Sequence, residues 1–499
     1  MKQNRDFRKS LMNFSKTNHP LWDINISNMK KIIFVGNGIL SLMAALRIIQ
    51  KDQQIDITVI GPNNREGCAS VAAPAMLNSY AELIRGSLDT KIDRDKFKIS
   101  QLASLKWQTI FDKLEEFNVS KPKPEFGTYI LNNATTDKFD DDNFNAIVDY
   151  LEEFQEEYEF VNPNYIPGYS PTSSGRAIRA IYMKNEGFVN SENVLDYLVD
   201  YLKNKGVKFI DNKVSKLNAK NNKIESVSLE NGIELKADIF QLSSGATFSK
   251  ILDNSNLGLN IQRVLYGSGV AIEIKPKEFN FTNCIRTPNR GLACGVYSAP
   301  RTKDTIFVGA SNYVANYPLE SGMLTSIESL LKASMEQINS SFYNAGFIGT
   351  KVGWRPTTQD TYPLIGKVSK YDNFFIATGT KRDGFHSSPV ISEFMTSLIL
   401  NEKYEHEEYF SYFVPEREII KNISREKAIR DIVEHQISAM YQHDFVPPKS
   451  NMLNQYKEIL EKEAIELHNK FGAVEWGIPP ELYEMYKEGY LSFPDTQIK

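Results

Sequence analysis

The sequence predicts an α/β protein built on a doubly wound domain that is interrupted by two insertions and followed by a helical extension. Three observations predict this class. An apolar run, Lys31–Val35, ends at a glycine-rich turn that leads into a helical pattern. Similar strand-and-glycine signals return near residues 239–246 and 374–379. The segments between these signals lack the rhythm, which indicates one doubly wound domain in separated pieces with a second domain inserted.

The first unit is a strand, a turn, a helix and a second strand over Ile55–Ile60. A glycine-rich turn between a strand and a helix exposes backbone N–H groups at the positive end of the helix dipole, which suits a pyrophosphate. Gly36 permits the tight turn and Gly38 lets a phosphate approach the backbone. Ser41 stands at the third glycine position and still permits close helix–strand packing. Alone, this pattern is equally typical of a tight turn in any α/β protein.

The second strand lacks the acidic residue that commonly binds an adenosine ribose. Asn63 or Asn64 is the expected replacement. A run of small residues, Gly67–Leu77, follows, and it leaves room for a cofactor beside Ala69 and Ser70. The Ser70 hydroxyl can bond a phosphate or ribityl oxygen. The alternative interpretation of this run is a packing interface of small residues.

Later elements follow from apolar periodicity and capping residues. The expected helices and strands are a helix over 191–205, a strand over 207–210, a hairpin over 223–235, strands over 239–242 and 374–377, and a helix over 389–401 with Ser388 as N-cap and Pro389 in its first turn. Within the insertions we expect a helix over 98–117 and strands over 268–274 and 305–310.

These elements divide the chain into four parts. The expected parts are a flexible N-terminal extension, 1–28; a nucleotide-binding domain from 29–90, 187–250 and 350–405; an inserted domain from 91–186 and 251–349; and a helical C-terminal extension, 406–499. The last part carries two apolar stripes, one over 429–440 and one over 456–467. Because single amphipathic helices are marginal in water, we expect the stripes to dock on the body or to form a homodimer.

Composition excludes several function classes. The 499 residues include 58 basic and 62 acidic side chains, a formal net charge of −4, so no bulk positive field exists for nucleic acid. No apolar run is long enough to span a bilayer. Three cysteines without CxxC spacing and six scattered histidines argue against a metal site. The first 28 residues lack the apolar core of a secretion signal, so the cytoplasm is the expected location.

Two further stretches, Gly353–Gly366 and Asn373–Pro389, carry a specific resemblance. Together they are similar to the carboxy-terminal signature of the D-amino-acid oxidase and glycine oxidase superfamily of FAD enzymes, and the resemblance covers about residues 31–400. It implies a Rossmann-type FAD-binding domain with an inserted, mostly antiparallel α+β substrate domain, and noncovalently bound FAD. The implied reaction is hydride transfer from a carbon bearing an amine to flavin N5, which gives an imine. The substrate is then a small amine or amino acid.

The resemblance also implies residue roles. The arginine of its Gly-x-Arg-Pro motif, here Arg355, holds the substrate carboxylate, and a structural ion pair is the alternative. Arg382 adds positive charge near the flavin or a second substrate contact. His386 is a candidate pocket residue, although a solvent-facing position is the preferred interpretation. Tyr129 faces the substrate or packs in the core. The remaining expected FAD contacts are Val214, Gly245, Gly379, Gly384 and Phe385.

Two other functions stay open at this point. A flavin-dependent monooxygenase would use NAD(P)H, but the sequence has no second glycine-rich dinucleotide turn. A flavoprotein subunit with a mainly interaction role would explain the helical extension. Reduction of the flavin by NADPH or by amines distinguishes these alternatives.

Overall fold

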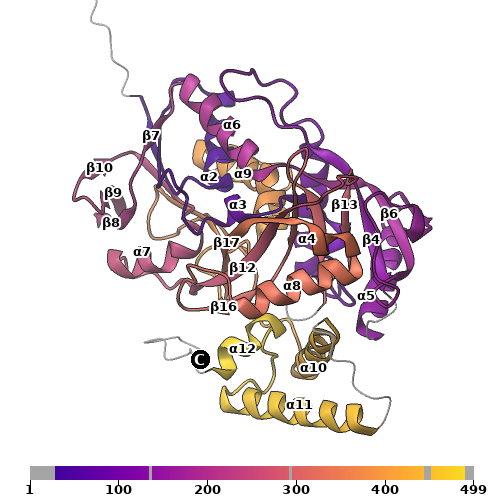
Figure 1. Ribbon diagram of the computed structural model, residues 1–499. Coiled ribbons are helices and arrows are strands. Elements are labelled where there is room, and N and C mark those ends of the chain that lie inside the picture. Colours follow the sequence, from indigo (N-terminus) through magenta and orange to yellow (C-terminus); the bar gives the residue numbers. More distant parts are fainter. Residues whose placement is uncertain (1–28, 134–137, 291–294, 443–450, 489–499) are drawn as a thin grey trace, which may run out of the picture.

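The computed structural model describes residues 29–133, 138–290, 295–442 and 451–488. The expected N-terminal extension, 1–28, lies outside the described residues. Figure 1 shows a large mixed α/β body with the helices of the C-terminal extension gathered at one end of it. None of the helices in the described ranges is long and apolar enough to cross a membrane.

A six-stranded sheet forms the first half of the body. Its order is β18-β19-β11-β1-β2-β7, and the pairs are parallel except for β18 with β19. The strands are β1 (Lys31–Val35), β2 (Asp56–Ile60), β7 (Lys208–Ile210), β11 (Ile239–Leu242), β18 (Leu364–Lys367) and β19 (Phe374–Thr378). The strands β1, β2, β7, β11 and β19 confirm those expected from the apolar runs, and β18 is an additional strand.

Both faces of this sheet are covered, which explains why its strands are continuously apolar. Ile32 and Phe34 face one apolar cluster, while Ile33 and Val35 face another. The first cluster contains the helices α2 (Ile39–Lys51), α4 (Lys91–Trp107), α6 (Ser191–Asn204) and α9 (Gly384–Leu400). The second contains α7 (Phe248–Ser255) and an antiparallel sheet of β8 (Val214–Lys220), β9 (Lys223–Leu229) and β10 (Glu234–Lys236).

A ten-stranded, mostly antiparallel sheet forms the second half, with α5 (Lys138–Glu153) and α8 (Leu324–Gln337) beside it. Its strands are β3 (Met76–Leu77), β4 (Glu125–Asn133), β5 (Tyr158–Val161), β6 (Ala177–Phe188), β12 (Val264–Lys275), β13 (Cys284–Arg286), β14 (Tyr297–Pro300), β15 (Ile306–Gly309), β16 (Tyr313–Ala315) and β17 (Gly346–Thr358). Most of these strands come from the two insertions. The Gly353–Pro356 motif also belongs to this sheet, because it lies within β17 and pairs with β12.

Two helices begin earlier than expected. Helix α4 replaces the helix expected over 98–117: it begins at Lys91 because the Thr90 hydroxyl accepts a hydrogen bond from the Asp93 N–H, and it ends at Trp107. Helix α9 begins at Gly384, so Pro389 lies inside it instead of in its first turn. A proline lacks the N–H that would bond the carbonyl four residues earlier. Here the Ser388 hydroxyl donates to that carbonyl, on Phe385, at 2.8 Å, so Ser388 is not the N-cap.

The C-terminal extension packs on the ten-stranded sheet. It contains η5 (Glu407–Phe410), α10 (Arg425–Gln442), α11 (Asn451–Lys470), η6 (Pro480–Leu482) and α12 (Tyr483–Lys487). Leu265 and Val314 of the body share a buried apolar cluster with Ile432 and Leu482 of the extension. The stripe over 429–440 is therefore largely covered, whereas Tyr456 and Ile459 of the second stripe stay exposed. Homodimer formation through these helices stays a prediction.

Candidate functional site

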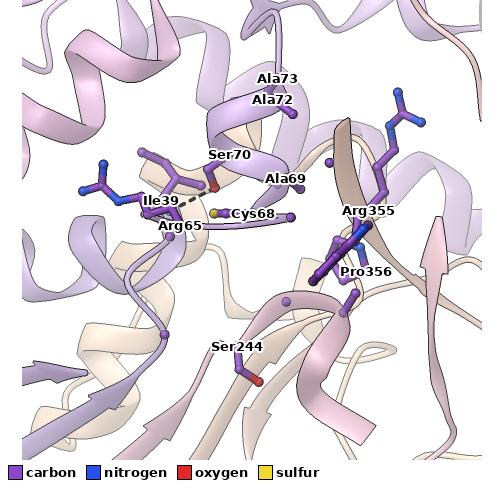
Figure 2. Close-up of a pocket in the computed structure, with 18 of the residues that line it drawn as sticks. Ile39, Arg65, Cys68, Ala69, Ser70, Ala72, Ala73, Ser244, Arg355 and Pro356 are labelled. Atoms are coloured by element: carbon purple, nitrogen blue, oxygen red, sulfur yellow. Dashed lines mark hydrogen bonds between the residues drawn. The ribbon is translucent and has the colours of Figure 1, made fainter. Parts of the chain in front are cut away.

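A cavity of about 540 Å³ lies where the six-stranded sheet meets the ten-stranded sheet. It is lined by the β1–α2 turn, the small-residue run, β17 and the loop before α9. Figure 2 shows Cys68–Ala73 on one side of this space and Arg355 and Pro356 on the other. The predicted residues in its lining are Gly36, Gly38, Ala69, Ser70, Val214, Gly245, Arg355, Arg382, Gly384, Phe385 and His386.

The glycine turn has the geometry of a phosphate cradle. Gly36 has φ +112°, and a β-carbon there would lie 2.4 Å from the Ser243 carbonyl oxygen, so other residues are excluded. Gly38 caps α2 without a side chain that covers the helix N-terminus. The Ile39 N–H donates to Ser70 Oγ at 3.2 Å, as the dashed line in Figure 2 shows. The turn, the N-terminus of α2 and the Ser70 hydroxyl thus line the cavity together, which fits a dinucleotide pyrophosphate.

The small-residue run both lines the cavity and packs. A β-carbon on Gly353 would lie 2.6 Å from Ala72 Cβ, and one on Gly67 would lie 2.3 Å from the Trp354 ring. Strand β17 can therefore approach α3 (Ala69–Ala72) and the turn before it only because Gly353 and Gly67 have no side chains. The packing interpretation therefore describes this run, and because Ala69 and Ser70 also line the cavity, their contact with a cofactor stays a prediction.

Two predicted cofactor residues do not line the cavity because they serve packing. Ser41 is fully buried inside α2, where its small side chain sits within the helix layer. Gly379 has φ +70°, and a β-carbon there would lie 2.6 Å from Thr358 Cγ2. Gly379 therefore lets the β19 loop approach β17 and does not contact the cavity itself.

Asn63 and Tyr129 also lie outside the lining. Asn63 is exposed, and its N–H donates to an Asp211 carboxylate oxygen at 2.8 Å. Arg65 lines the cavity in this region instead. Tyr129 packs against Tyr182 with ring centroids 4.8 Å apart, so the alternative of core packing describes it.

Arg355, on β17, lines the cavity, and Figure 2 shows it across from Cys68 and Ser70. Its Nη1 donates to the Ser311 carbonyl at 2.8 Å and to Asn312 Oδ1 at 3.1 Å. Among the described residues no carboxylate lies within ion-pair distance of this guanidinium, so the alternative of a structural ion pair is not seen. Nε and Nη2 make no hydrogen bond with the described part of the chain. The Arg355 guanidinium is therefore a cation that is held on its Nη1 side. Its Nε–Nη2 edge, called the free edge below, makes no hydrogen bond with the described residues.

A chain of alternating charges forms another part of the cavity wall. Arg286 Nη1 lies 2.5 Å from one Glu82 oxygen, and Arg382 Nε lies 3.4 Å from the other. Burial opposes ionisation of Glu82, but Arg286 and Arg382 hold its pKa below the ordinary value. Lys381 also lines the cavity. Sequence reasoning missed Glu82, Arg286 and Lys381 because no motif marks them and their chain segments meet only in the fold.

His386 is buried, contrary to the preferred solvent-facing position. Only 4% of it is exposed, because α9 begins at Gly384 and carries His386 into the body. Its Nε2 donates to the Ser100 carbonyl at 3.0 Å, and burial lowers its pKa to about 4. His386 is therefore neutral near pH 7. Beside it, Phe385 stacks on Trp107 with ring centroids 5.6 Å apart, which fixes the start of α9.

The cysteines have different environments. Cys68 lines the cavity, and Cys284 is fully buried with its pKa raised to about 12 by burial. Cys294 lies outside the described residues. Within residues 29–133, 138–290, 295–442 and 451–488, no group of three or more His, Cys, Asp or Glu side chains could hold a metal ion.

Comparison with known proteins agrees with this arrangement. A family model described as FAD dependent oxidoreductase matches residues 31–398. Glycine oxidase of Pseudomonas putida is 28% identical over 177 residues, which cover 36% of this chain and 45% of that protein. The alignment thus spans less than half of the relative's length.

Two solved structures share the fold. Iminodiacetate oxidase from Chelativorans sp. BNC1 superposes with a TM-score of 0.66 at 17% identity, over 77% of this chain and 98% of that one. Glycine oxidase from Geobacillus kaustophilus gives a TM-score of 0.66 at 15% identity, over 79% and 100% of the two chains. The family match ends at residue 398, so the C-terminal extension lies beyond it.

Proposed function

Because the chain belongs to the family of FAD-dependent oxidoreductases, we propose that it oxidises the carbon–nitrogen bond of an amino acid or a related amine. FAD is the cofactor of this family, and we propose that it is bound noncovalently here. The turn at Gly36–Gly38, the start of α2 and the Ser70 hydroxyl would hold its pyrophosphate. Bound FAD supplies the hydride acceptor.

The observation that carries the proposal is the free edge of Arg355. A planar guanidinium binds a carboxylate with two parallel hydrogen bonds, and here the Nε–Nη2 edge has no partner among the described residues. Ser311 and Asn312 hold the other side of the group, so the edge has a fixed direction. A substrate carboxylate bound there would have its α-carbon fixed relative to the cavity, which is the main contribution of positioning to catalysis.

The chain's other residues orient the substrate and keep out water. His386 is a poor acceptor for the amine proton, because burial lowers its pKa to about 4 and its unprotonated Nδ1 is buried. A substrate amine can lose its proton to solvent before oxidation, which removes the need for a general base. Phe385 and Trp354 supply apolar surface to the cavity lining and limit water there.

The test is anaerobic reduction of the purified yellow protein by a panel of amino acids and amines. Bleaching by amino acids, with Arg355→Met losing about 10- to 150-fold in kcat/KM at normal FAD content, supports the proposal. Arg355→Lys keeps the charge but loses the two parallel bonds, so it should fall between. Unchanged kinetics in Arg355→Met would indicate a substrate without a carboxylate. Bleaching by NADPH would instead favour a flavin-dependent monooxygenase.

A further inference from the structure

The C-terminal extension reaches the wall of the cavity through one buried carboxylate. Glu481 lies in η6, between α11 and α12, and 16% of its side chain is exposed. Its Oε1 lies 2.5 Å from Lys381 Nζ and 3.7 Å from Arg382 Nη2. Both cations line the cavity, whereas Glu481 does not.

These contacts extend the charged wall described above. Along this wall Arg382 lies between the carboxylates of Glu481 and Glu82, and Glu82 also pairs with Arg286. Lys381 contacts the same Glu481 carboxylate as Arg382. Lys381 is adjacent in sequence to Arg382 and has a left-handed backbone, φ +55°. Its N–H donates to the Pro356 carbonyl at 2.9 Å, next to Arg355. Displacement of the Lys381 and Arg382 side chains would therefore change the cavity wall on the same side as Arg355.

The contact is built firmly into the fold. Leu482 and Tyr483, which follow Glu481, are 0% and 1% exposed and belong to the apolar cluster between extension and body. Burial opposes ionisation of Glu481, but Lys381 and Arg382 hold its pKa below the ordinary value. Burial, together with the neighbouring cations Arg382 and Lys96, lowers the pKa of Lys381, and the Glu481 carboxylate opposes this shift, so this cation also depends on the carboxylate.

We propose that Glu481 is a positioning residue of the cavity: its carboxylate fixes the side chains of Lys381 and Arg382, so the substrate end of the cavity is complete only when the C-terminal extension is docked. The family match stops before the extension, so this contact adds to the family's site. The inference rests on the proposed carboxylate substrate, because it concerns how the cavity receives that group.

The chain offers a matched control. Glu434 of α10 also carries one carboxylate of the extension to the body, where it pairs with Arg85. Neither Glu434 nor Arg85 lines the cavity. Glu434→Gln and Glu481→Gln therefore remove the same charge from the same interface, but only the second changes groups that line the cavity.

The experiment titrates the FAD-loaded, full-length protein with benzoate and follows the visible flavin spectrum. We expect the Kd for benzoate to rise about 10-fold or more in Glu481→Gln and to stay within about 2-fold in Glu434→Gln. Benzamide, which lacks the charge, should not distinguish the variants. With the best-reducing amino acid from the panel, Glu481→Gln should raise KM more than it lowers kcat. Glu481→Asp keeps the charge and should recover part of the affinity.

Melting temperature and FAD content show whether each variant is folded. If Glu481→Gln does not fold, the benzoate titration is made with Glu481→Asp instead. Equal or tighter benzoate binding in folded Glu481→Gln would overturn the positioning role. Equal losses in the Glu481 and Glu434 variants would also overturn it, because they would reflect docking alone. If Arg355→Met leaves benzoate binding unchanged, the proposed function fails instead, which separates the two failures.

Discussion

The guanidinium of Arg355 occupies the space that a side chain on Gly269 would need. A β-carbon on Gly269 would lie 2.2 Å from Arg355 Nη1, and the two residues belong to the paired strands β17 and β12. Nη1 is also the atom that Ser311 and Asn312 hold. The direction of the free edge of Arg355 thus depends on the absence of a side chain on the neighbouring strand.

Gly269→Ala should therefore weaken substrate binding by displacing Arg355. The added methyl group displaces the Arg355 guanidinium from Ser311 and Asn312. We expect kcat/KM to fall about 10-fold, which corresponds to the low end of the free energy of one charge-assisted hydrogen bond. FAD content should stay normal. Gly349→Ala is the control, because a β-carbon there meets nothing within 4 Å. Equal kinetics in both variants would contradict the role assigned to this space.

Gly38→Val should abolish FAD binding while the protein still folds. Gly38 has φ −81°, so its backbone accepts a side chain, and the nearest atom to a β-carbon is Ser70 Oγ at 3.3 Å. A larger side chain would fill the space above the helix N-terminus where a phosphate would lie. The flavin-to-protein absorbance ratio measures the loss, and Gly38→Ala should retain more flavin than Gly38→Val. Full flavin content in Gly38→Val would place the pyrophosphate elsewhere.

The central sheet and the phosphate turn could be predicted because local signals determine them. A buried parallel strand such as β1 must be continuously apolar, and the turn at Gly36 needs a positive φ that only glycine adopts readily. The place of Arg355 in the cavity lining could be predicted because this residue stands in a recognisable motif. Glu82, Arg286 and Glu481 could not, since each belongs to a different segment and gains its role only through packing. The burial of His386 was missed because the start of α9 depends on a serine that satisfies the carbonyl freed by Pro389.

Arg417→Ala should strongly destabilise the protein. Arg417, in the extension between η5 and α10, pairs with Asp360, whose side chain is 0% exposed, and its Nη2 lies 3.0 Å from Asp360 Oδ1. Removing one partner of a buried pair leaves an uncompensated charge, at a cost of about 3–5 kcal/mol in free energy of unfolding. Arg263→Ala breaks an exposed pair with Asp253 and should cost less than about 1 kcal/mol. Denaturant unfolding of the FAD-loaded proteins compares the two, and equal losses would show that burial does not set the difference.

His386 should make the protein less stable as the pH falls from about 6.5 to about 4. Burial lowers its pKa in the folded protein to about 4. Its Nδ1 is buried without a hydrogen-bond partner, so a proton added there would have no acceptor. The unfolded chain then binds the proton more tightly than the folded one, and stability decreases with acidification through this window.

The His386→Gln variant isolates this contribution. The amide can still donate to the Ser100 carbonyl but does not titrate, so the acid-dependent loss should shrink by up to about 3 kcal/mol. His435, with a pKa lowered to about 4, also decreases the stability of the protein on acidification. Glu186, with a pKa raised to about 7, increases the stability on acidification. Because both groups are present in the two proteins, the difference between their unfolding free energies from pH 7 to pH 4 reports His386. An identical pH dependence in wild type and variant would show that His386 gains its proton without cost.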